Sequence, residues 1–302
     1  MVRGIAIHRS PFVEPNSSGA ALRQPSTLEP YALGKVPIVV PPQAPALAPL
    51  VRSVSIVEDV LPSRRERMVP TGGTNLLINL DADEFRTYDG LGNGRVRRVR
   101  GAVLAGPRDR PTVIDTEEQR WLLIVDFLPG GALPFLVAPP WETSNQWVEL
   151  HDLWGADGGV LRERLLEAAT TVQRLQIVES TLLDHAVRPL RPDPAIAFAA
   201  AAFERGVSVS EVTSRLGLSP KSFTRRFRER VGLLPKRFSR VRRLQRVLET
   251  VEGRQTVDWA GVALDHHYCD QAHLIHDFRE MVGMTPSAYL QAVEHQRNHV
   301  PL

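Results

Sequence analysis

The residues with the most evident chemistry gather in one short stretch near the C-terminus. Residues 266–277, HHYCDQAHLIHD, contain four of the nine histidines and the only cysteine of the chain. Imidazole and thiolate are ligands that zinc and copper favour. A metal site here would draw on His266, His267, Cys269, His273 and His276. Such a site also needs neighbouring groups that orient its ligands. The sequence shows no signal of them, so we expect no bound metal.

A second stretch has the charge of a surface that binds a polyanion. Residues 221–246 hold 11 basic residues and one acid, Glu229, although the net charge of the whole chain is only +3. Clustering of this kind is typical of nucleic-acid-binding proteins. The alternative interpretation, from charge alone, is a helix face that is simply solvated.

The composition narrows the class of protein. At 302 residues, of which 43% are hydrophobic and 24% charged, the chain has room for about two globular domains. No apolar run approaches the ~18 residues of a membrane span, and residues 1–12 lack the apolar core of a secretory signal. The single cysteine permits no internal disulfide, which fits a reducing compartment. We therefore expect a cytoplasmic protein that has no membrane partner.

The N-terminal half offers little for catalysis. Before residue 180 the only histidines are His8 and His151, too few for a metal-dependent β-barrel enzyme. No cysteine lies there, and the Gly-x-Ser-x-Gly pattern of a serine nucleophile is missing. We expect no catalytic residues, no enzymatic activity and no bound cofactor. Four tryptophans are interpreted as packing anchors, with an aromatic effector pocket as the alternative: Trp121, Trp141, Trp147 and Trp154.

The elements that must position the charged and polar residues begin with an N-terminal β-rich region. Residues 1–49 carry nine of the 24 prolines, and we expect a flexible extension there. Residues 50–187 are expected to form a β-rich domain that ends in helices, because helical spacing of apolar residues begins at about residue 158. Its β-friendly runs are separated by glycine-rich turns and lie at 75–80, 95–106 and 120–128.

The C-terminal region is helical and contains one supersecondary unit twice. Residues 188–193 are interpreted as a linker, residues 194–292 as the helical domain and residues 293–302 as a tail. Within the domain, LGLSPKSFTRRFRERVGLLPKRF and HHYCDQAHLIHDFREMVGMTPSAYL match at an offset of 51 residues, so that Phe-Arg-Glu at 227–229 recurs at 278–280. Each copy is interpreted as helix, turn, helix. The predicted fold class is α+β, with a β-rich domain before an all-α domain that holds two helix-turn-helix units.

The first copy has the faces that a DNA-reading helix needs. Phe223, Phe227 and Val231 share one apolar side at helical spacing. Lys221 and Arg225 then point to the opposite side. A helix with an apolar back and a cationic front suits the major groove of DNA. Between the copies, residues 235–251 form a long helix whose arginines are expected to contact phosphates: Arg237, Arg240, Arg243 and Arg246.

The two copies and the arginine-rich helix between them resemble the paired helix-turn-helix domain of AraC/XylS-type transcription regulators. The Gly-x-x-Pro-x-x-aromatic ending, present as GLLPKRF and GMTPSAY, makes this resemblance specific. Upstream, GPRDRPTVI, DFLPGGALPFL and ELHDLWGADGGVLRERLLEA resemble the sensory domain of a subgroup of these regulators. In the wider family a cupin-like β-barrel that binds an effector or dimerises often holds this position. The resemblance implies that residues 50–187 sense a ligand or dimerise.

The resemblance also implies which side chains read bases. They are Lys221, Thr224 and Arg225 in the first copy, and Gln271, Ala272, Ile275 and His276 in the second. Lysine and arginine suit guanine, and glutamine suits adenine. Arg226 and Arg228 are added to the four phosphate-contacting arginines of the connecting helix. Two positions depart from the family pattern: His267 stands where glycine is usual, and His276 where arginine is common.

The sequence therefore predicts a sequence-specific DNA-binding transcription regulator that responds to an effector through its N-terminal domain and either activates or represses transcription. The expected partners are double-stranded DNA, a small-molecule effector, RNA polymerase and a second copy of the chain. One alternative is a constitutive DNA-binding or interaction module that senses no small molecule. Another is a metal-responsive regulator that uses the histidines and cysteine at 266–276.

Overall fold

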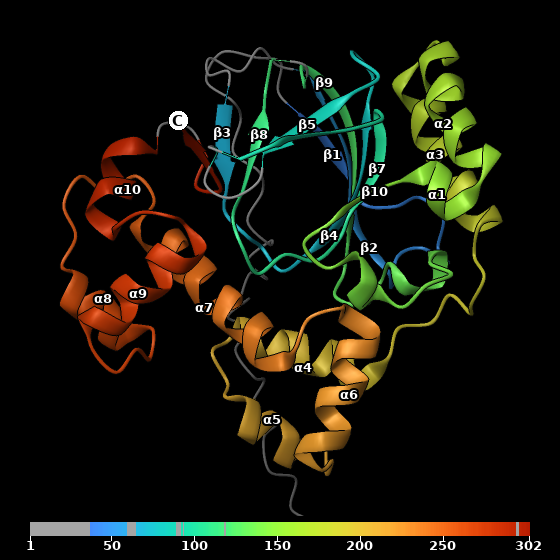
Figure 1. The fold of residues 1–302 in the computed structure, drawn as a ribbon. Helices are drawn as coiled ribbons and strands as arrows, with labels where there is room; N and C mark the ends of the chain where they lie inside the picture. Colours follow the sequence, from blue (N-terminus) through green and yellow to red (C-terminus); the bar gives the residue numbers. More distant parts are fainter. Residues whose placement is uncertain (1–36, 59–64, 89–91, 93, 118, 294–295) are drawn as a thin grey trace, which may run out of the picture.

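The computed structural model describes residues 37–58, 65–88, 92, 94–117, 119–293 and 296–302. Most of the segment expected to be flexible, residues 1–36, lies outside these ranges. A β-rich domain comes first in the chain and a helical domain follows it (Figure 1). The predicted fold class, with a β-rich domain before a helical domain, is therefore confirmed.

Two antiparallel sheets build the β-rich domain. Sheet A consists, in spatial order, of β1 (Ile38–Val40), β2 (Val51–Glu58), β9 (Trp121–Phe127), β4 (Thr74–Asn79), β7 (Ala102–Ala105) and β10 (Trp147–Glu149). Sheet B consists of β11 (His299–Pro301), β3 (Arg65–Met68), β8 (Thr112–Asp115), β5 (Phe85–Tyr88) and β6 (Val96–Val99). The sequence runs expected to be strands thus lie in both sheets, and β4 pairs with β9 with Leu76 opposite Val125.

Sheet A is covered on both faces, because successive side chains of a strand point to opposite sides. Leu76 and Ile78 belong to a core that they share with helical residues such as Leu161 and Val178. Leu77, which lies between them, belongs to a second core with residues of sheet B. Sheet A is therefore layered between sheet B and a group of helices (Figure 1). These helices are α1 (Leu150–Trp154), α2 (Ala156–Glu167) and α3 (Thr171–Asp184).

The tryptophans of this domain are packing residues. Each has a partner of its own: Trp121 lies beneath Arg174, Trp141 beneath Arg228, Trp147 against Phe85 and Trp154 against His185. This dispersed arrangement fits anchors better than the walls of one aromatic pocket.

The helical domain contains seven helices among the described residues. They are α4 (Pro194–Glu204), α5 (Val209–Arg215), α6 (Pro220–Val231), α7 (Pro235–Val251), α8 (Trp259–Asp265), α9 (Gln271–Met281) and α10 (Pro286–Ala292). Proline opens α4, α6, α7 and α10, at a position where its missing amide proton costs nothing. Six of the seven begin with a side-chain cap, supplied by Asp193, Ser208, Ser219, Asp258, Asp270 and Thr285.

Each helix-turn-helix unit has its own core, and α7 contributes to both. In the first core four phenylalanine rings pack at centroid separations of 5.4 to 6.2 Å: Phe203, Phe223, Phe227 and Phe238. In the second core Phe278 of α9 meets Trp259 and Tyr289 edge to face. The apolar face that the sequence predicts for α6 is buried in the first core, and α7 buries residues in both.

The helical domain docks on the β-rich domain through α7. The Arg242 guanidinium donates a hydrogen bond to the backbone carbonyl of Thr71 at 3.0 Å. The Gln245 side-chain amide donates to the carbonyl of Pro70 at the same distance. Val69 completes the contact by joining the core of the second unit. The loop that precedes β4 therefore holds α7 against the sheets.

Two terminal segments are built into the fold, contrary to the sequence prediction. Residues 37–49 are not part of a flexible extension, because β1 pairs with β2 and Leu47 is completely buried. Residues 296–302 are not merely part of a tail, because β11 pairs with β3 at the edge of sheet B and Val300 is completely buried. In both cases a distant strand supplies the partner, which the local pattern does not reveal.

A membrane-spanning helix is not found among the described residues, since none of their helices combines the length and the apolar character that crossing a membrane requires.

Candidate nucleic-acid interface

The two helix-turn-helix units have the same turn, with one difference in length. Gly217 ends the first turn at a φ of +63°, and His267 takes the same left-handed conformation at +59°. The next residue closes each turn with a backbone hydrogen bond, from Leu218 in the first and Tyr268 in the second. The first helices of the units match at an offset of 50 residues and the second helices at 51. Cys269 is therefore an additional residue between the turn and the cap of α9.

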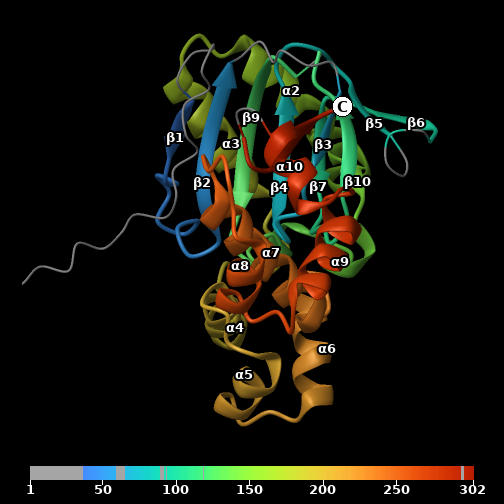
Figure 2. The ribbon, with the colours of Figure 1, turned by 90° about the vertical axis from the view of Figure 1, so that its left-hand side faces the viewer.

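The side chains expected to read bases in the first unit lie on the outer face of α6. Lys221 and Arg225 are exposed, and Thr224 is half-buried. Among the described residues, neither Lys221 nor Arg225 has a side-chain hydrogen bond or an ion pair. Figure 2 shows α5 and α6 at the end of the molecule remote from the sheets. Both cations are thus free to meet an external anion.

The corresponding face of the second unit is less cationic. Gln271, Ala272 and His276 of α9 are exposed, and Ile275 is half-buried. His276 lies one turn from Glu280, with 3.7 Å between its Nε2 and a carboxylate oxygen. The cationic first helix and the mainly neutral second helix therefore present different surfaces to a ligand.

All six arginines expected to contact phosphates have intramolecular partners. Their contacts are Arg226 with Asp193, Arg228 with the Trp141 ring, Arg237 with Asp109 and Glu280, Arg240 with Asp277 and Glu280, Arg243 with Asp277, and Arg246 with the Phe203 carbonyl. The arginines of α7 are thus not the freely available cations that the sequence predicts. Their contact with phosphates stays a prediction, and it would require most of these pairs to break.

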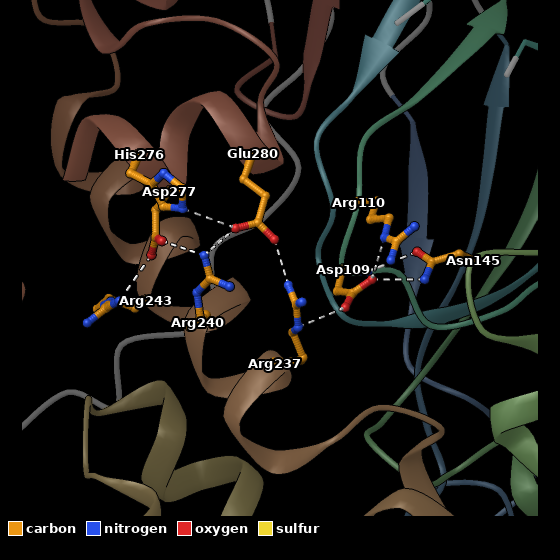
Figure 3. Close-up of polar contacts among 9 residues, drawn as sticks. All are labelled: Asp109, Arg110, Asn145, Arg237, Arg240, Arg243, His276, Asp277 and Glu280. Atoms are coloured by element: carbon orange, nitrogen blue, oxygen red, sulfur yellow. Dashed lines mark hydrogen bonds and ion pairs between the residues drawn. The ribbon is translucent and has the colours of Figure 1, made fainter. Parts of the chain in front are cut away.

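The densest of these contacts join α7 to α9 (Figure 3). One nitrogen of Arg240 lies 2.6 Å from a carboxylate oxygen of Asp277 and 2.6 Å from one of Glu280. Arg243 contacts the other oxygen of Asp277 at 3.0 Å. The Asp277 side chain is 0% exposed, whereas those of Arg240 and Arg243 are 20% and 19% exposed. A completely buried carboxylate is therefore neutralised from two sides.

The same cluster reaches the β-rich domain. Arg237 contacts Glu280 at 2.6 Å and, from its Nε, lies 3.8 Å from Asp109. Asp109 lies in the loop before β8 and accepts a hydrogen bond from the Asn145 side chain at 2.9 Å. Figure 3 shows Arg237 between the two domains. We call the set Asp109, Arg237, Arg240, Arg243, Asp277 and Glu280 the interdomain ion cluster.

The charges of this cluster support one another. Hydrogen bonding from Arg240, and then from Arg237, lowers the pKa of Glu280 to about 2 against the opposing effect of partial burial. Burial lowers the pKa of Arg240, but its hydrogen bonds to Asp277 and Glu280 outweigh that effect and raise it. Glu280 and Arg240 are therefore each held in the charged form at neutral pH.

The histidines and the cysteine at 266–276 are dispersed. His266 shares a hydrogen bond of 2.9 Å with the Thr250 hydroxyl, and burial lowers its pKa. His273 lies edge-on to Tyr268, and Cys269 is exposed. Within the described residues, no three histidine, cysteine or acidic side chains converge as metal ligands would. The turn position of His267 explains its place better than metal binding does.

Sequence reasoning missed the acidic members of the cluster. The available signal for Asp277 was the internal duplication, because the equivalent residue of the first unit is Arg226 and a reversal of charge stands out there. Glu280 gives no such signal, since Glu229 occupies the equivalent position. Asp109 lies in another domain, and no local pattern connects it to α7.

Comparisons with known proteins divide the chain in the same way. A family model described as a helix-turn-helix domain matches residues 212–292. Another, described as a domain of unknown function (DUF6597), matches residues 39–149. No curated protein sequence matches the chain.

Among solved structures, those of ToxT from Vibrio cholerae resemble this fold. ToxT from strain O395 has 9% sequence identity and a TM-score of 0.41, and the match covers 79% of this chain and 95% of that one. An apo variant from strain SCE256 has 11% identity and a TM-score of 0.43, with coverage of 79% and 96%. Wild-type ToxT from the same strain, crystallised with an unsaturated fatty acid, has 9% identity and a TM-score of 0.39, with coverage of 78% and 93%.

Proposed function

Because residues 212–292 form an AraC-type helix-turn-helix domain behind a β-rich domain, we propose that the chain is a sequence-specific DNA-binding transcription regulator. One observation carries this proposal: the duplicated unit presents two exposed recognition-helix faces, and the cations of the first, Lys221 and Arg225, have no side-chain hydrogen bond or ion pair to any residue that the structure describes. The alternative, a cationic helix face that is merely solvated, would not explain why the helix-turn-helix unit occurs twice.

The two recognition helices have separate tasks in this proposal. Lys221 and Arg225 of α6 donate to the O6 and N7 acceptors of guanine in the major groove. Gln271 of α9 makes the paired contact that suits adenine. Thr224, Ala272, Ile275 and His276 complete the two surfaces. The cationic α6 supplies the larger share of the electrostatic attraction, and affinity falls as salt rises because bound phosphates release counterions.

The β-rich domain is proposed to make this binding responsive to a small-molecule effector and to join two copies of the chain. Its loops contact both units, which supports such a role. The Ser144 hydroxyl donates to the carbonyl of Gly232 at the end of α6, at 2.8 Å. Asp109 contacts Arg237 at the start of α7. A ligand that shifted these loops would act on both recognition helices. RNA polymerase would then respond to the resulting change in the DNA-bound protein.

The proposal is tested by selecting binding sites for the full chain from random-sequence DNA. We expect a bipartite site. Arg225→Ala should lower discrimination at one base pair of it by about 5- to 150-fold, the equivalent of roughly 1–3 kcal/mol. Arg254→Ala is the matched control, because Arg254 is an exposed cation in the loop after α7. Equal losses on selected and random DNA for Arg225→Ala would refute the base-reading role. Selection of no sequence at all would refute the regulator itself.

Effector responsiveness needs a separate experiment. Thermal unfolding of the chain is measured with a panel of small molecules, and DNA binding is then measured with any that raises the unfolding temperature. A ligand that stabilises the chain and changes its affinity for the selected site supports a sensor. A stabilising ligand without effect on DNA binding favours the constitutive module.

A further inference from the structure

Each recognition helix is tied by a charged pair to the helix that precedes its own unit. In the first unit Arg226 of α6 makes a two-pronged contact with Asp193, the cap of α4, at 2.8 and 2.7 Å. The equivalent residue of α9, at the offset of 51, is Asp277, which contacts Arg240 and Arg243 of α7. An ion-pair link thus holds each recognition helix to the helix that precedes its unit. In the first unit the recognition helix supplies the basic partner, and in the second unit it supplies the acidic one.

The second link is the more deeply buried of the two. Asp193 has a side-chain exposure of 10%, whereas Asp277 has none. A buried carboxylate that loses its cationic partners keeps its desolvation cost and has nothing to offset it. Arg240 therefore cannot swing to a DNA phosphate without leaving Asp277 to Arg243 alone. The geometry favours an arginine that stays on the protein.

Across the part of the chain that the structure describes, only the second link continues into the other domain through a carboxylate. Glu280 joins Arg240 to Arg237, and Arg237 joins Asp109 of the β-rich domain. Its counterpart in the first unit, Glu229, is exposed and has no hydrogen bond or ion pair from its side chain within the described residues. The two units are therefore alike in fold and unlike in their connection to the β-rich domain.

A second contact ties α9 to the β-rich domain, as the Ser144 hydroxyl ties the end of α6 through the carbonyl of Gly232. Arg67 of β3, which is buried, donates a hydrogen bond of 3.3 Å to the carbonyl of Val282 at the end of α9. A cation at the C-terminus of a helix complements the partial negative charge there. Both the last turn of α9 and its inner face thus touch groups that the β-rich domain fixes in place.

We propose that Arg237 and Arg240 are positioning residues for the second recognition helix, and that the path Asp109–Arg237–Glu280 makes the base preference of that helix depend on its contact with the β-rich domain. This inference rests on the proposed function, since it concerns how one of the two DNA-reading helices is held. It assigns to Arg237 and Arg240 a role other than neutralising phosphates.

The two roles predict different measurements. An arginine that contacts a phosphate supplies affinity for every sequence, and its loss lowers the slope of log K against log salt by about 0.9. A positioning arginine leaves that slope unchanged. Loss of a carboxylate near DNA also separates the two roles. If the carboxylate acts only by its charge, its loss should tighten binding to all DNA. If it positions α9, its loss should weaken the discrimination between base pairs in one half-site.

The central test compares Glu280→Gln with Glu229→Gln in the full chain. The variants remove the same charge from equivalent positions of α9 and α6. The half-site read by α6 is identified as the one that Arg225→Ala disturbs. Glu280→Gln should lower discrimination in the other half-site by about tenfold, the scale of one mismatched base pair, with the α6 half-site unchanged. Glu229→Gln should shift the affinity for all DNA slightly upwards and alter neither preference.

The path to the β-rich domain is tested with Asp109→Asn against Asp152→Asn. Asp152 is an exposed carboxylate of α1 and supplies the matched loss of charge. Asp109→Asn should lower discrimination in the α9 half-site by a smaller factor, about threefold, because Arg237 keeps Glu280. Asp152→Asn should have no selective effect. Circular dichroism of each variant checks that the helices are intact.

Three results would overturn the inference. Glu280→Gln could tighten binding to all DNA as Glu229→Gln does. Arg240→Gln could lower the salt slope by about 0.9 on selected and random DNA alike. Asp109→Asn could match Asp152→Asn at both half-sites. Failure of the proposed function looks different: the unaltered chain would then select no sequence, and the positioning role would fall with it.

Discussion

Removal of Arg240 should destabilise the protein more than neutralisation of Asp277, although the two changes break the same contact. The reason is the difference in exposure. Asp277 is cut off from water, whereas the arginines that surround it are each about one-fifth exposed. In Arg240→Met the carboxylate keeps only Arg243, at 3.0 Å. In Asp277→Asn both guanidinium groups can still reach water, and Arg240 keeps Glu280.

The magnitudes follow from that geometry. Breaking a fully buried ion pair from one side costs about 3–5 kcal/mol. Because Arg243 remains, we expect Arg240→Met to lower the free energy of unfolding by about 2–3 kcal/mol, and the double variant Arg240→Met/Arg243→Met by about 3–5 kcal/mol. Asp277→Asn should cost about 1–2 kcal/mol, since the amide oxygen still accepts a hydrogen bond from one arginine, whereas the amide nitrogen cannot accept from the other, which turns to water. Adding Asp277→Leu to the double variant should recover much of its loss, because no buried charge is left unpaired.

Urea unfolding of the full chain, followed by circular dichroism, measures these differences from the shift in midpoint at a constant slope. The order of stability is the critical result. If the double arginine variant were as stable as Asp277→Asn, or if adding Asp277→Leu lowered its stability further, the buried carboxylate would not be the group that the arginines neutralise, and the positioning argument would lose its energetic basis.

Two further predictions concern the second unit. His267→Gly should raise the free energy of unfolding by about 0.5–1 kcal/mol. A left-handed residue other than glycine costs roughly 1–2 kcal/mol, and the greater conformational entropy of glycine in the unfolded chain offsets part of the improvement. A lower midpoint in urea would show that the histidine ring stabilises the turn. The stabilising effect of Glu280 should depend on pH: its pKa is lowered in the folded chain to about 2, so the contribution is complete above about pH 5 and declines as the pH falls towards 2. The difference in unfolding free energy between the unaltered chain and Glu280→Gln, about 1 kcal/mol for such a half-exposed pair, should therefore be constant from pH 5 to 8 and smaller at pH 3, and an equal difference at pH 3 and 7 would contradict this assignment.

Local patterns in the sequence were sufficient for the helical domain. The faces of α6 were predicted from Phe223, Phe227 and Val231, and all three are buried. The cap of α6 by Ser219 and the opening proline follow from rules that involve residues within one helical turn. His267 takes the left-handed conformation that suits the glycine usual at its place in the turn. These features depend on neighbours three or four positions apart, which the sequence displays directly.

Tertiary structure decided what the charged residues do. The spacing of Arg237, Arg240 and Arg243 along one helix is compatible with phosphates outside or carboxylates inside the protein, and only the angle at which α9 meets α7 places Asp277 and Glu280 within their reach. The placement of Asp109 beside Arg237, and of β11 against β3, likewise joins segments far apart in the chain. The sequence determines which face of each helix is apolar and which is cationic, because that follows from local periodicity. The partner of each cation depends on how whole elements dock, because an ion pair forms only where two distant surfaces meet within a few ångströms.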